Sequence, residues 1–242
     1  MKPVNQRDQY ELIALENRLQ PDALARKGQR LRLLGWELSA ISSTLLKRVI
    51  DIVISLSTLI CLAPLFAVVV ALIRMTDGGP ALFWQVRVGK WGRPFAFPKF
   101  RSMVIDAEAQ RLKLLQANQH GSNGVTFKMK RDPRITWIGR IIRKTSIDEL
   151  PQLWCVLKGE MSLVGPRPAL VSEVANYTLD NRRRLDITPG LTCTWQVSGR
   201  SEIPFEEQCR LDVEYIEQQS TLADIKLLLK TIPAVVTGKG AY

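Results

Sequence analysis

The clearest pattern in the chain is an apolar segment over residues 49–73, in which Asp51 is the only charged residue. Lys47, Arg48 and Arg74 bracket this segment. At a rise of about 1.5 Å per residue, one helix of this length would reach roughly 37 Å, more than the roughly 30 Å of a bilayer core. The pattern predicts a segment that enters a membrane. It is not expected to be a signal peptide, because a polar arm precedes it and no convincing cleavage site follows it.

Pro64 lies near the middle of the apolar segment and opposes a continuous helix, because proline lacks a backbone N–H and clashes with the preceding turn. Basic residues stand at both ends, so the positive-inside rule assigns no orientation. Two topologies stay open from the residues alone. One is a single transmembrane span, and the other is a re-entrant hairpin that enters and leaves through the cytoplasmic face.

The rest of the pattern predicts an α/β chain that is mainly helical, with a few short strands. Residues 1–46 form a polar, helix-prone arm, which is either a surface helix packed on the domain or a basic amphipathic helix on a membrane. Alternation predicts strands over 81–88 and 95–97 around a turn at 89–94. Helices are predicted over residues 105–118, 146–158, 204–219 and 222–236, the last interrupted at Pro233.

Length and charge narrow the function classes. The 242 residues, with 46% hydrophobic and 24% charged side chains, suit one folded domain with appendages. The formal net charge of +11 predicts a polyanionic partner. That partner is a nucleic acid, an anionic membrane surface or a phosphorylated substrate.

The thiols and the single histidine exclude several chemistries. Cys61, Cys155, Cys193 and Cys209 form no C-x-x-C pair, and His120 alone cannot complete a zinc site with them. Reduced, cytosolic thiols are the simpler expectation. With one histidine, an enzyme of this sequence must depend on carboxylates, lysine and arginine.

Residues 143–153 (RKTSIDELPQL) contain the strongest candidate for chemistry. Ser146 and Glu149 have the spacing of a capping box, and acidic residues suit the first turn of a helix, which explains Asp148 and Glu149 without any function. The alternative is that Asp148 is an activated nucleophile, because a carboxylate at a helix start beside Arg143 and Lys144 stays ionised and attracts a phosphate. A divalent cation shared with a diphosphate would reduce the repulsion between the two anions.

Three further stretches place basic residues where they could bind a phosphate. In residues 165–168 (GPRP), two prolines fix the backbone around Arg167, which suits bidentate binding of a phosphate. Lys99 and Arg101 occupy alternate positions of an extended stretch, so both are expected on one face. Residues 189–200 form a loop that ends in Arg200. Each could equally be a solvated turn or strand.

The order of these motifs is more specific than any one of them. A basic-flanked, Pro-broken apolar segment is followed by KFRSM, DELPQL, GEMSLVGPRP and PGLTCTWQVSGR. This order resembles the bacterial sugar transferase family, the monotopic phosphoglycosyl transferases, in its small form with an N-terminal arm. The resemblance covers about Lys47 to Tyr242.

The resemblance implies an activity and its partners. Family members transfer a sugar 1-phosphate from a UDP-sugar to undecaprenyl phosphate with release of UMP, and Mg²⁺ assists. The reaction passes through a phosphosugar-aspartyl intermediate and begins polysaccharide or exopolysaccharide assembly, which downstream glycosyltransferases continue. The enzymes lie in the bacterial inner membrane, in contact with its lipids, with the catalytic domain on the cytoplasmic face.

The resemblance also implies site residues. Asp148 would be the nucleophile and a Mg²⁺ ligand, and Glu149 would be catalytic and pair with Arg143. Arg167 would bind phosphate. The expected substrate-binding residues are Lys99, Arg101, Arg143, Pro166, Arg167, Pro168, Gln196, Arg200 and Asp212.

The implied fold is a re-entrant membrane helix hairpin over residues 47–75, fused to a compact cytoplasmic catalytic domain over 76–242 with amphipathic interfacial helices. Two departures from the family are visible. Ala63 precedes Pro64 where many relatives carry serine, and residues 193–195 read Cys-Thr-Trp where others have Gly-Trp-Ala. The second departure bears on the choice of sugar.

Two other classes were weighed. A nucleic-acid-binding protein would fit the +11 charge but leaves the apolar segment unexplained, and no recognised binding motif occurs, so no nucleic-acid partner is expected. A single-pass membrane anchor with a non-catalytic, basic cytoplasmic interaction domain is the main alternative. A homodimer is compatible with the sequence.

Overall fold

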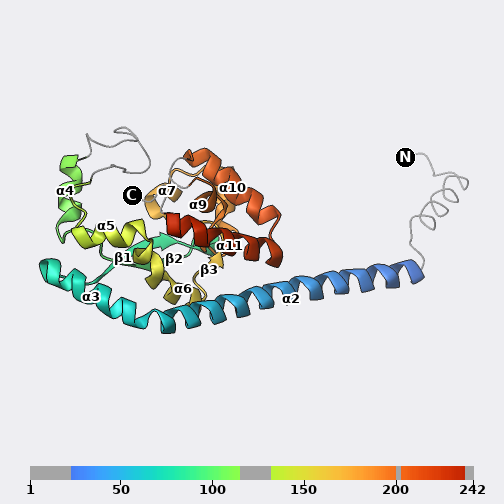
Figure 1. The fold of residues 1–242 in the computed structure, drawn as a ribbon. Coiled ribbons are helices and arrows are strands. Elements are labelled where there is room, and N and C mark those ends of the chain that lie inside the picture. Colours follow the sequence, from blue (N-terminus) through green and yellow to red (C-terminus); the bar gives the residue numbers. More distant parts are fainter. Residues whose placement is uncertain (1–22, 115–131, 200–202, 238–242) are drawn as a thin grey trace, which may run out of the picture. The chain divides into compact units, whose positions relative to one another are not determined.

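The computed structural model describes residues 23–114, 132–199 and 203–237 (Figure 1). The chain divides into two compact units, residues 1–46 and residues 47–242. The second unit contains every strand that the structure describes.

The apolar segment folds as two helices that meet at Leu62. They are α2 (Ala23–Cys61) and α3 (Ala63–Asp77). Pro64 lies in the first turn of α3 and has no N–H to donate to the carbonyl four residues earlier, so the predicted break is confirmed. Within the described residues, no single helix meets the length and hydropathy expected of a membrane span. The segments Ser42–Cys61 and Ala63–Asp77 meet it only together, bent by 59°.

Polar and apolar side chains on this helix pair are reversed relative to a water-soluble helix. Val53, Ile60 and Val68 are each more than half exposed. Asp51 is 4% exposed and Ser55 is 0% exposed, so the polar side chains point into the protein. A helix on the surface of a soluble protein shows the opposite pattern.

Two small sheets form the centre of the second unit. Strands β1 (Leu82–Val88) and β2 (Pro94–Phe100) are antiparallel and joined by a turn that contains η1 (Lys90–Gly92), which confirms the predicted strand pair. The short β4 (Ala169–Leu170) pairs with the end of β1. Strands β3 (Ser162–Val164) and β5 (Gly190–Thr192) form a separate parallel pair. In the view of Figure 1, β1 and β2 lie between α4 and α5 on one side and α9, α10 and α11 on the other.

The alternation of β2 divides the core into two clusters. Phe95 and Phe97 belong to the larger cluster, and Phe100 belongs to the smaller one. The larger cluster receives residues of α6 (Leu153–Lys158), β3 and α10 (Phe205–Glu217). The smaller one joins α3 to α5 (Trp137–Lys144). Strand β2 therefore links α3 to the rest of the unit.

The helix predicted over 146–158 begins as a 3₁₀-helix and not as an α-helix. Residues Ile147–Gln152 form a 3₁₀-helix, η3, and α6 follows it. Pro151 lies inside η3, where it cannot donate an α-helical hydrogen bond to Ile147. Ser146 has left-handed backbone angles (φ 56°, ψ 16°) and its side chain caps nothing, so the predicted capping box is wrong.

The remaining predicted helices agree in place. They are α4 (Ala107–Leu114), α10 and α11 (Thr221–Thr237), although residues 115–118 lie outside the described part. The interruption predicted at Pro233 is wrong, because α11 continues through it. The carbonyl that Pro233 leaves without a donor belongs to Leu229, an exposed position of the helix. The short elements are α7 (Val171–Val174), α8 (Leu179–Arg182), η4 (Arg183–Leu185) and α9 (Thr194–Ser198).

Candidate active site

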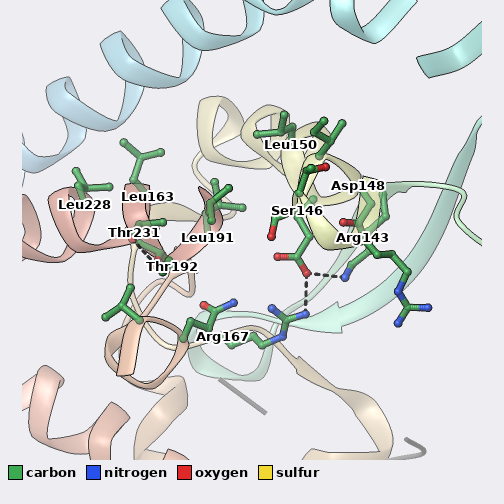
Figure 2. Close-up of a pocket in the computed structure, with 18 of the residues that line it drawn as sticks. Arg143, Ser146, Asp148, Leu150, Leu163, Arg167, Leu191, Thr192, Leu228 and Thr231 are labelled. Carbon is green, nitrogen blue, oxygen red and sulfur yellow. Dashed lines mark hydrogen bonds and ion pairs between the residues drawn. The ribbon is translucent and has the colours of Figure 1, made fainter. Parts of the chain in front are cut away.

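A cavity of about 610 Å³ lies where η3, β2, α9, α11 and the α2–α3 break converge. One end of it is polar and the other is apolar (Figure 2). Six predicted site residues line it: Lys99, Arg143, Asp148, Glu149, Arg167 and Gln196. Arg143, Asp148 and Glu149 are close in the sequence, and the tertiary fold brings Lys99, Arg167 and Gln196 to them.

Glu149 is the centre of the polar end. Its Oε1 accepts hydrogen bonds from Lys99 Nζ at 2.8 Å and from Arg167 Nη2 at 2.9 Å (Figure 2). Strand β2 supplies Lys99, and the loop between β3 and β4 supplies Arg167. These two ion pairs take the place of the pair with Arg143 that the resemblance implied.

The charged groups of this cluster shift one another's pKa values. Burial alone would raise the pKa of Glu149, but Arg167 and Lys99 outweigh it and hold the pKa well below its usual range. Burial lowers the pKa of Lys99, although Glu149 opposes this effect. Glu149 raises the pKa of Arg167. Glu149 is therefore a permanent anion that holds two cations at the cavity wall.

Asp148 is the neighbouring carboxylate, but its surroundings differ. It is 8% exposed and lines the same cavity. Burial raises its pKa to about 6, while Lys99 and Arg143 act in the opposite direction. At neutral pH such a group is mostly ionised yet more basic than an ordinary aspartate, which suits a nucleophile.

The loop that carries Arg167 is fixed on both sides, as the two prolines predicted. Pro166 O accepts a hydrogen bond from Gly190 N at 2.8 Å, and Pro168 O accepts one from Arg87 Nη1 at 3.0 Å. Both prolines are buried and neither lines the cavity, so they orient Arg167 without being placed to touch a ligand. A Cβ on Gly190 would lie 2.0 Å from Gly165 N, so only glycine fits there.

Arg87 is a functional candidate that the sequence analysis missed. It lies on β1, and its Nε also donates to Gln85 Oε1 at 2.9 Å. Burial, with help from Arg167, lowers its pKa to about 10. Its position two residues after Gln85 on one strand face was the available signal, but nothing in the sequence joined it to residues 165–168.

The apolar end of the cavity combines the helix break with the C-terminal helix. Leu62 and Leu65 come from the break, and Leu228, Ala234 and Val235 come from α11. In Figure 2, Leu163 and Leu228 lie on the left, Asp148 and Arg143 lie on the right, and Arg167 lies near the middle below them. The cavity can therefore receive a ligand with a charged head and an apolar tail.

Helix α9 also contributes to the cavity wall. Trp195 and Gln196 line it, and Cys193 Sγ donates to Gln196 Oε1 at 3.1 Å. Thr192 and Thr231, which also line it, share a hydrogen bond of 2.8 Å between their hydroxyl oxygens. An aromatic ring beside amides and hydroxyls suits a nucleobase or a sugar.

Of the other predicted substrate-binding residues, Arg101 and Asp212 also lie away from the cavity lining. Arg101 is buried and pairs with Asp77 instead of sharing a face with Lys99, because β2 ends at Phe100. Asp212 is also buried and does not line the cavity. Arg200 lies outside the described residues.

Asp212 forms a buried ion pair behind the cavity residue Trp195. Its Oδ2 lies 2.6 Å from Arg184 Nη2 and accepts a hydrogen bond from Trp195 Nε1 at 3.3 Å. Arg184 is 6% exposed, so this ion pair lies in the interior of the protein. Through its hydrogen bond, the pair fixes the orientation of the Trp195 side chain.

The carboxylates fit a magnesium ion only together with a substrate. Among the residues described, no three His, Cys, Asp or Glu side chains converge on a metal position. Protein-bound Mg²⁺ commonly uses one or two carboxylates and completes its shell with water and substrate phosphates. Asp148 can take that part, since Glu149 is already held by two cations.

Comparisons with known proteins identify the family of this chain. The model of the family described as bacterial sugar transferase matches residues 42–238. The galactosyl transferase CpsE of Streptococcus agalactiae is 54% identical over 166 residues, which are 68% of this chain and 36% of that protein. The UDP-galactose-lipid carrier transferase of Erwinia amylovora is 42% identical over 203 residues, which are 83% of this chain and 42% of that protein.

A third relative is the undecaprenyl-phosphate galactose phosphotransferase of Salmonella typhimurium. It is 45% identical over 205 residues, which are 83% of this chain and 42% of that protein. The chain thus spans well under half the length of these three relatives. Since the family match covers most of the sequence and includes every cavity residue, the chain belongs to the bacterial sugar transferase family.

Proposed function

We propose that this protein transfers a sugar 1-phosphate from a UDP-sugar to undecaprenyl phosphate, with release of UMP. The observation that carries the proposal is the position of Asp148, a buried and mostly ionised carboxylate among Lys99, Arg143 and Arg167. This set can bind a diphosphate and attack it in the same place. The names of the three relatives make UDP-galactose the first donor to test.

The cations of the polar end bind the donor. Arg167 presents a planar guanidinium that can grip two phosphate oxygens, and Lys99 adds a compact charge beside it. Glu149 neutralises part of their charge and keeps both side chains in place before the donor arrives. Trp195 and Gln196 are placed to contact the uridine or the sugar.

The first displacement forms a covalent intermediate. A carboxylate oxygen of Asp148 attacks the phosphorus that bears the sugar, and the bond from that phosphorus to the bridging oxygen breaks. UMP leaves with the bridging oxygen and its electron pair, and the phosphosugar stays on Asp148 as an acyl phosphate. When bound, Mg²⁺ would supply charge neutralisation between the carboxylate and the diphosphate.

The second displacement releases the product. A phosphate oxygen of undecaprenyl phosphate attacks the same phosphorus, and the bond to Asp148 breaks with return of its carboxylate. The product is undecaprenyl diphosphate sugar, the substrate of downstream glycosyltransferases in polysaccharide assembly. Leu62, Leu65 and Leu228 line the apolar end and offer a surface for the first part of the lipid chain.

A membrane location follows from the acceptor and from the helix pair. The exposed apolar and buried polar side chains of α2 and α3 suit lipid surroundings. The 59° bend and the basic residues at both ends favour a re-entrant hairpin on the cytoplasmic leaflet of the inner membrane. That is the face at which a cytosolic UDP-sugar is available.

Covalent labelling tests the proposal. The enzyme, Mg²⁺ and UDP-sugar labelled in the sugar are incubated without lipid, and the protein is separated and counted. Wild type should carry label and Asp148→Asn should not. With both substrates, initial-rate plots should be parallel. Equal label on the two proteins, or UMP release that requires the lipid, would show that the covalent route is wrong.

A further inference from the structure

The segment that follows Arg167 is held on strand β1. Its strand β4 lies opposite Arg87 and Val88 of β1 in an antiparallel pair. One residue earlier, Pro168 is buried, so its carbonyl oxygen needs a partner inside the protein. Arg87 supplies that partner, since its Nη1 donates to Pro168 O at 3.0 Å. The backbone directly after Arg167 is thus fixed both by the strand and by the side chain of Arg87.

The guanidinium of Arg87 is itself held in one orientation. Its Nε donates to Gln85 Oε1 at 2.9 Å. Its central carbon lies 5.2 Å from the centre of the Phe97 ring, and Phe97 is 1% exposed. A cation over an aromatic ring is attracted by the negative face of the ring. Two hydrogen bonds and one ring contact therefore fix the direction in which Arg87 reaches Pro168.

The Phe97 ring also joins Arg87 to the polar end of the cavity. Arg87 lies opposite Phe95, so it shares one face of the β1–β2 pair with Phe97 and Lys99. Lys99 Nζ is 5.4 Å from the centre of the Phe97 ring. Since Lys99 and Arg167 both bind Glu149, the contacts form a closed ring. Its members are, in order, Arg87, Pro168, Arg167, Glu149, Lys99 and Phe97.

The charge of Arg87 acts on Arg167 as well. Burial and the nearby Arg167 lower the pKa of Arg87 to about 10, so Arg87 stays cationic at neutral pH. Arg87 does not line the cavity, whereas Arg167 does. Repulsion between the two guanidiniums opposes a turn of Arg167 towards β1, and Glu149 attracts Arg167 at the cavity wall. Arg87 thus restricts Arg167 without being placed to touch a ligand.

We propose that Arg87 is a positioning residue for the phosphate-binding arginine. By holding Pro168 O, Arg87 sets the direction of the Arg167 guanidinium before the diphosphate of the donor binds. A guanidinium that is already oriented loses less conformational entropy when it grips two phosphate oxygens. The inference rests on the proposed function, because the ligand of Arg167 is taken to be the diphosphate of a UDP-sugar.

Binding of UDP alone, in the presence of Mg²⁺, tests this role without catalysis. Titration calorimetry gives the Kd, and its stoichiometry gives the fraction of protein that is folded. Arg87→Met removes the donors and the charge, whereas Arg87→Lys keeps the charge but loses the fork of donors. Arg93→Met is the matched control, because it removes the same charge from an exposed position of the turn between β1 and β2. The KM for UDP-galactose and the melting temperature are measured for each protein.

The expected result is weaker binding of UDP by folded protein. Arg87→Met should raise the Kd for UDP and the KM for UDP-galactose about tenfold or more, while Arg93→Met stays within about threefold of wild type. Arg87→Lys should lie between them, since lysine can still donate to Pro168 O. A purely structural role would lower the melting temperature and the stoichiometry and leave the Kd of the folded fraction unchanged. That outcome would overturn the proposal.

A double-mutant cycle with Arg167→Lys tests the route. If Arg87 acts through Arg167, the double variant with Arg87→Met should bind UDP little more weakly than Arg167→Lys alone. Losses of affinity that multiply would overturn the proposal. If Arg87→Met does not fold, Arg87→Lys takes its place in the cycle. A wild type that binds UDP but releases no UMP from any UDP-sugar would instead refute the proposed function, and the cycle would still decide the role of Arg87.

Discussion

Asp148 and Glu149 are adjacent in the sequence, yet the fold shifts the pKa values of their carboxylates in opposite directions. Burial raises the pKa of Asp148 to about 6. Burial acts on Glu149 as well, but Arg167 and Lys99 reverse its effect and lower that pKa. Neighbouring carboxylates with opposite shifts usually have different roles. In the proposed function, Asp148 attacks the phosphorus, and Glu149 holds the two cations that bind the phosphate oxygens.

The first prediction is a pH dependence. Attack requires ionised Asp148, so kcat/KM for the UDP-sugar should be half-maximal near pH 6 and fall about tenfold per unit below it. The UDP-sugar diphosphate stays ionised in this range, so the limb belongs to the enzyme. A rate that is flat from pH 7 to pH 5 would contradict this assignment. Melting curves at each pH exclude unfolding as the cause.

The second prediction concerns Arg167. Arg167→Lys keeps the charge but loses the two-pronged geometry, so kcat/KM should fall more than tenfold, equivalent to more than about 1.4 kcal/mol. Arg183→Lys is the matched control, because Arg183 is exposed and pairs with Glu217 on the surface. Equal activity of both variants would show that Arg167 does not grip the phosphate.

The helices and the first strand pair were predictable because their signals are local. The break near Pro64 follows from one missing N–H, and β1 and β2 follow from alternation around a turn. The capping box at Ser146 failed because spacing alone does not fix φ, and the chain enters η3 through a left-handed residue. Pro233 did not end α11, because the carbonyl that loses its donor belongs to Leu229, an exposed position of the helix.

The site was predictable in composition but not in pairing. Asp148, Arg167 and Lys99 were found through motifs, and the cavity joins them. The partners of an ion pair depend on distances in three dimensions. The spacing of residues in the sequence therefore could not show that Glu149 pairs with Lys99 and Arg167 instead of Arg143. For the same reason the sequence could not show Arg184 to be buried, since arginine side chains are mostly exposed in folded proteins.

The third prediction concerns topology. If α2 and α3 form a re-entrant hairpin, tags at residues 1 and 242 should both report the cytoplasm. Pro64→Leu restores the missing donor and should favour a continuous helix, which moves the N-terminal tag to the other face. Pro233→Leu is the control, because α11 already runs through that position. A periplasmic N-terminus in the wild type would support the single-pass alternative.

The last prediction compares how the free energy of unfolding changes when the charge of either of two neighbouring carboxylates is removed. The raised pKa of Asp148 means that the native state favours its neutral form, so this group's contribution to stability is lost as pH rises from its unfolded pKa near 4 to about 6. Asp148→Asn imitates the neutral form. At pH 7.5 it should abolish turnover while leaving the free energy of unfolding unchanged or higher by up to roughly 1–3 kcal/mol.

Glu149→Gln should do the opposite. The lowered pKa of Glu149 gives stability that is present above its unfolded pKa and is lost only as pH falls through the folded one. Removing its charge at pH 7.5 leaves Lys99 and Arg167 without their shared anion, at a cost of roughly 1–3 kcal/mol. Denaturant unfolding of both variants at pH 7.5 measures the two effects. Similar destabilisation by both substitutions would mean that Asp148 is a structural carboxylate, and the nucleophile would then have to be sought elsewhere in the cavity.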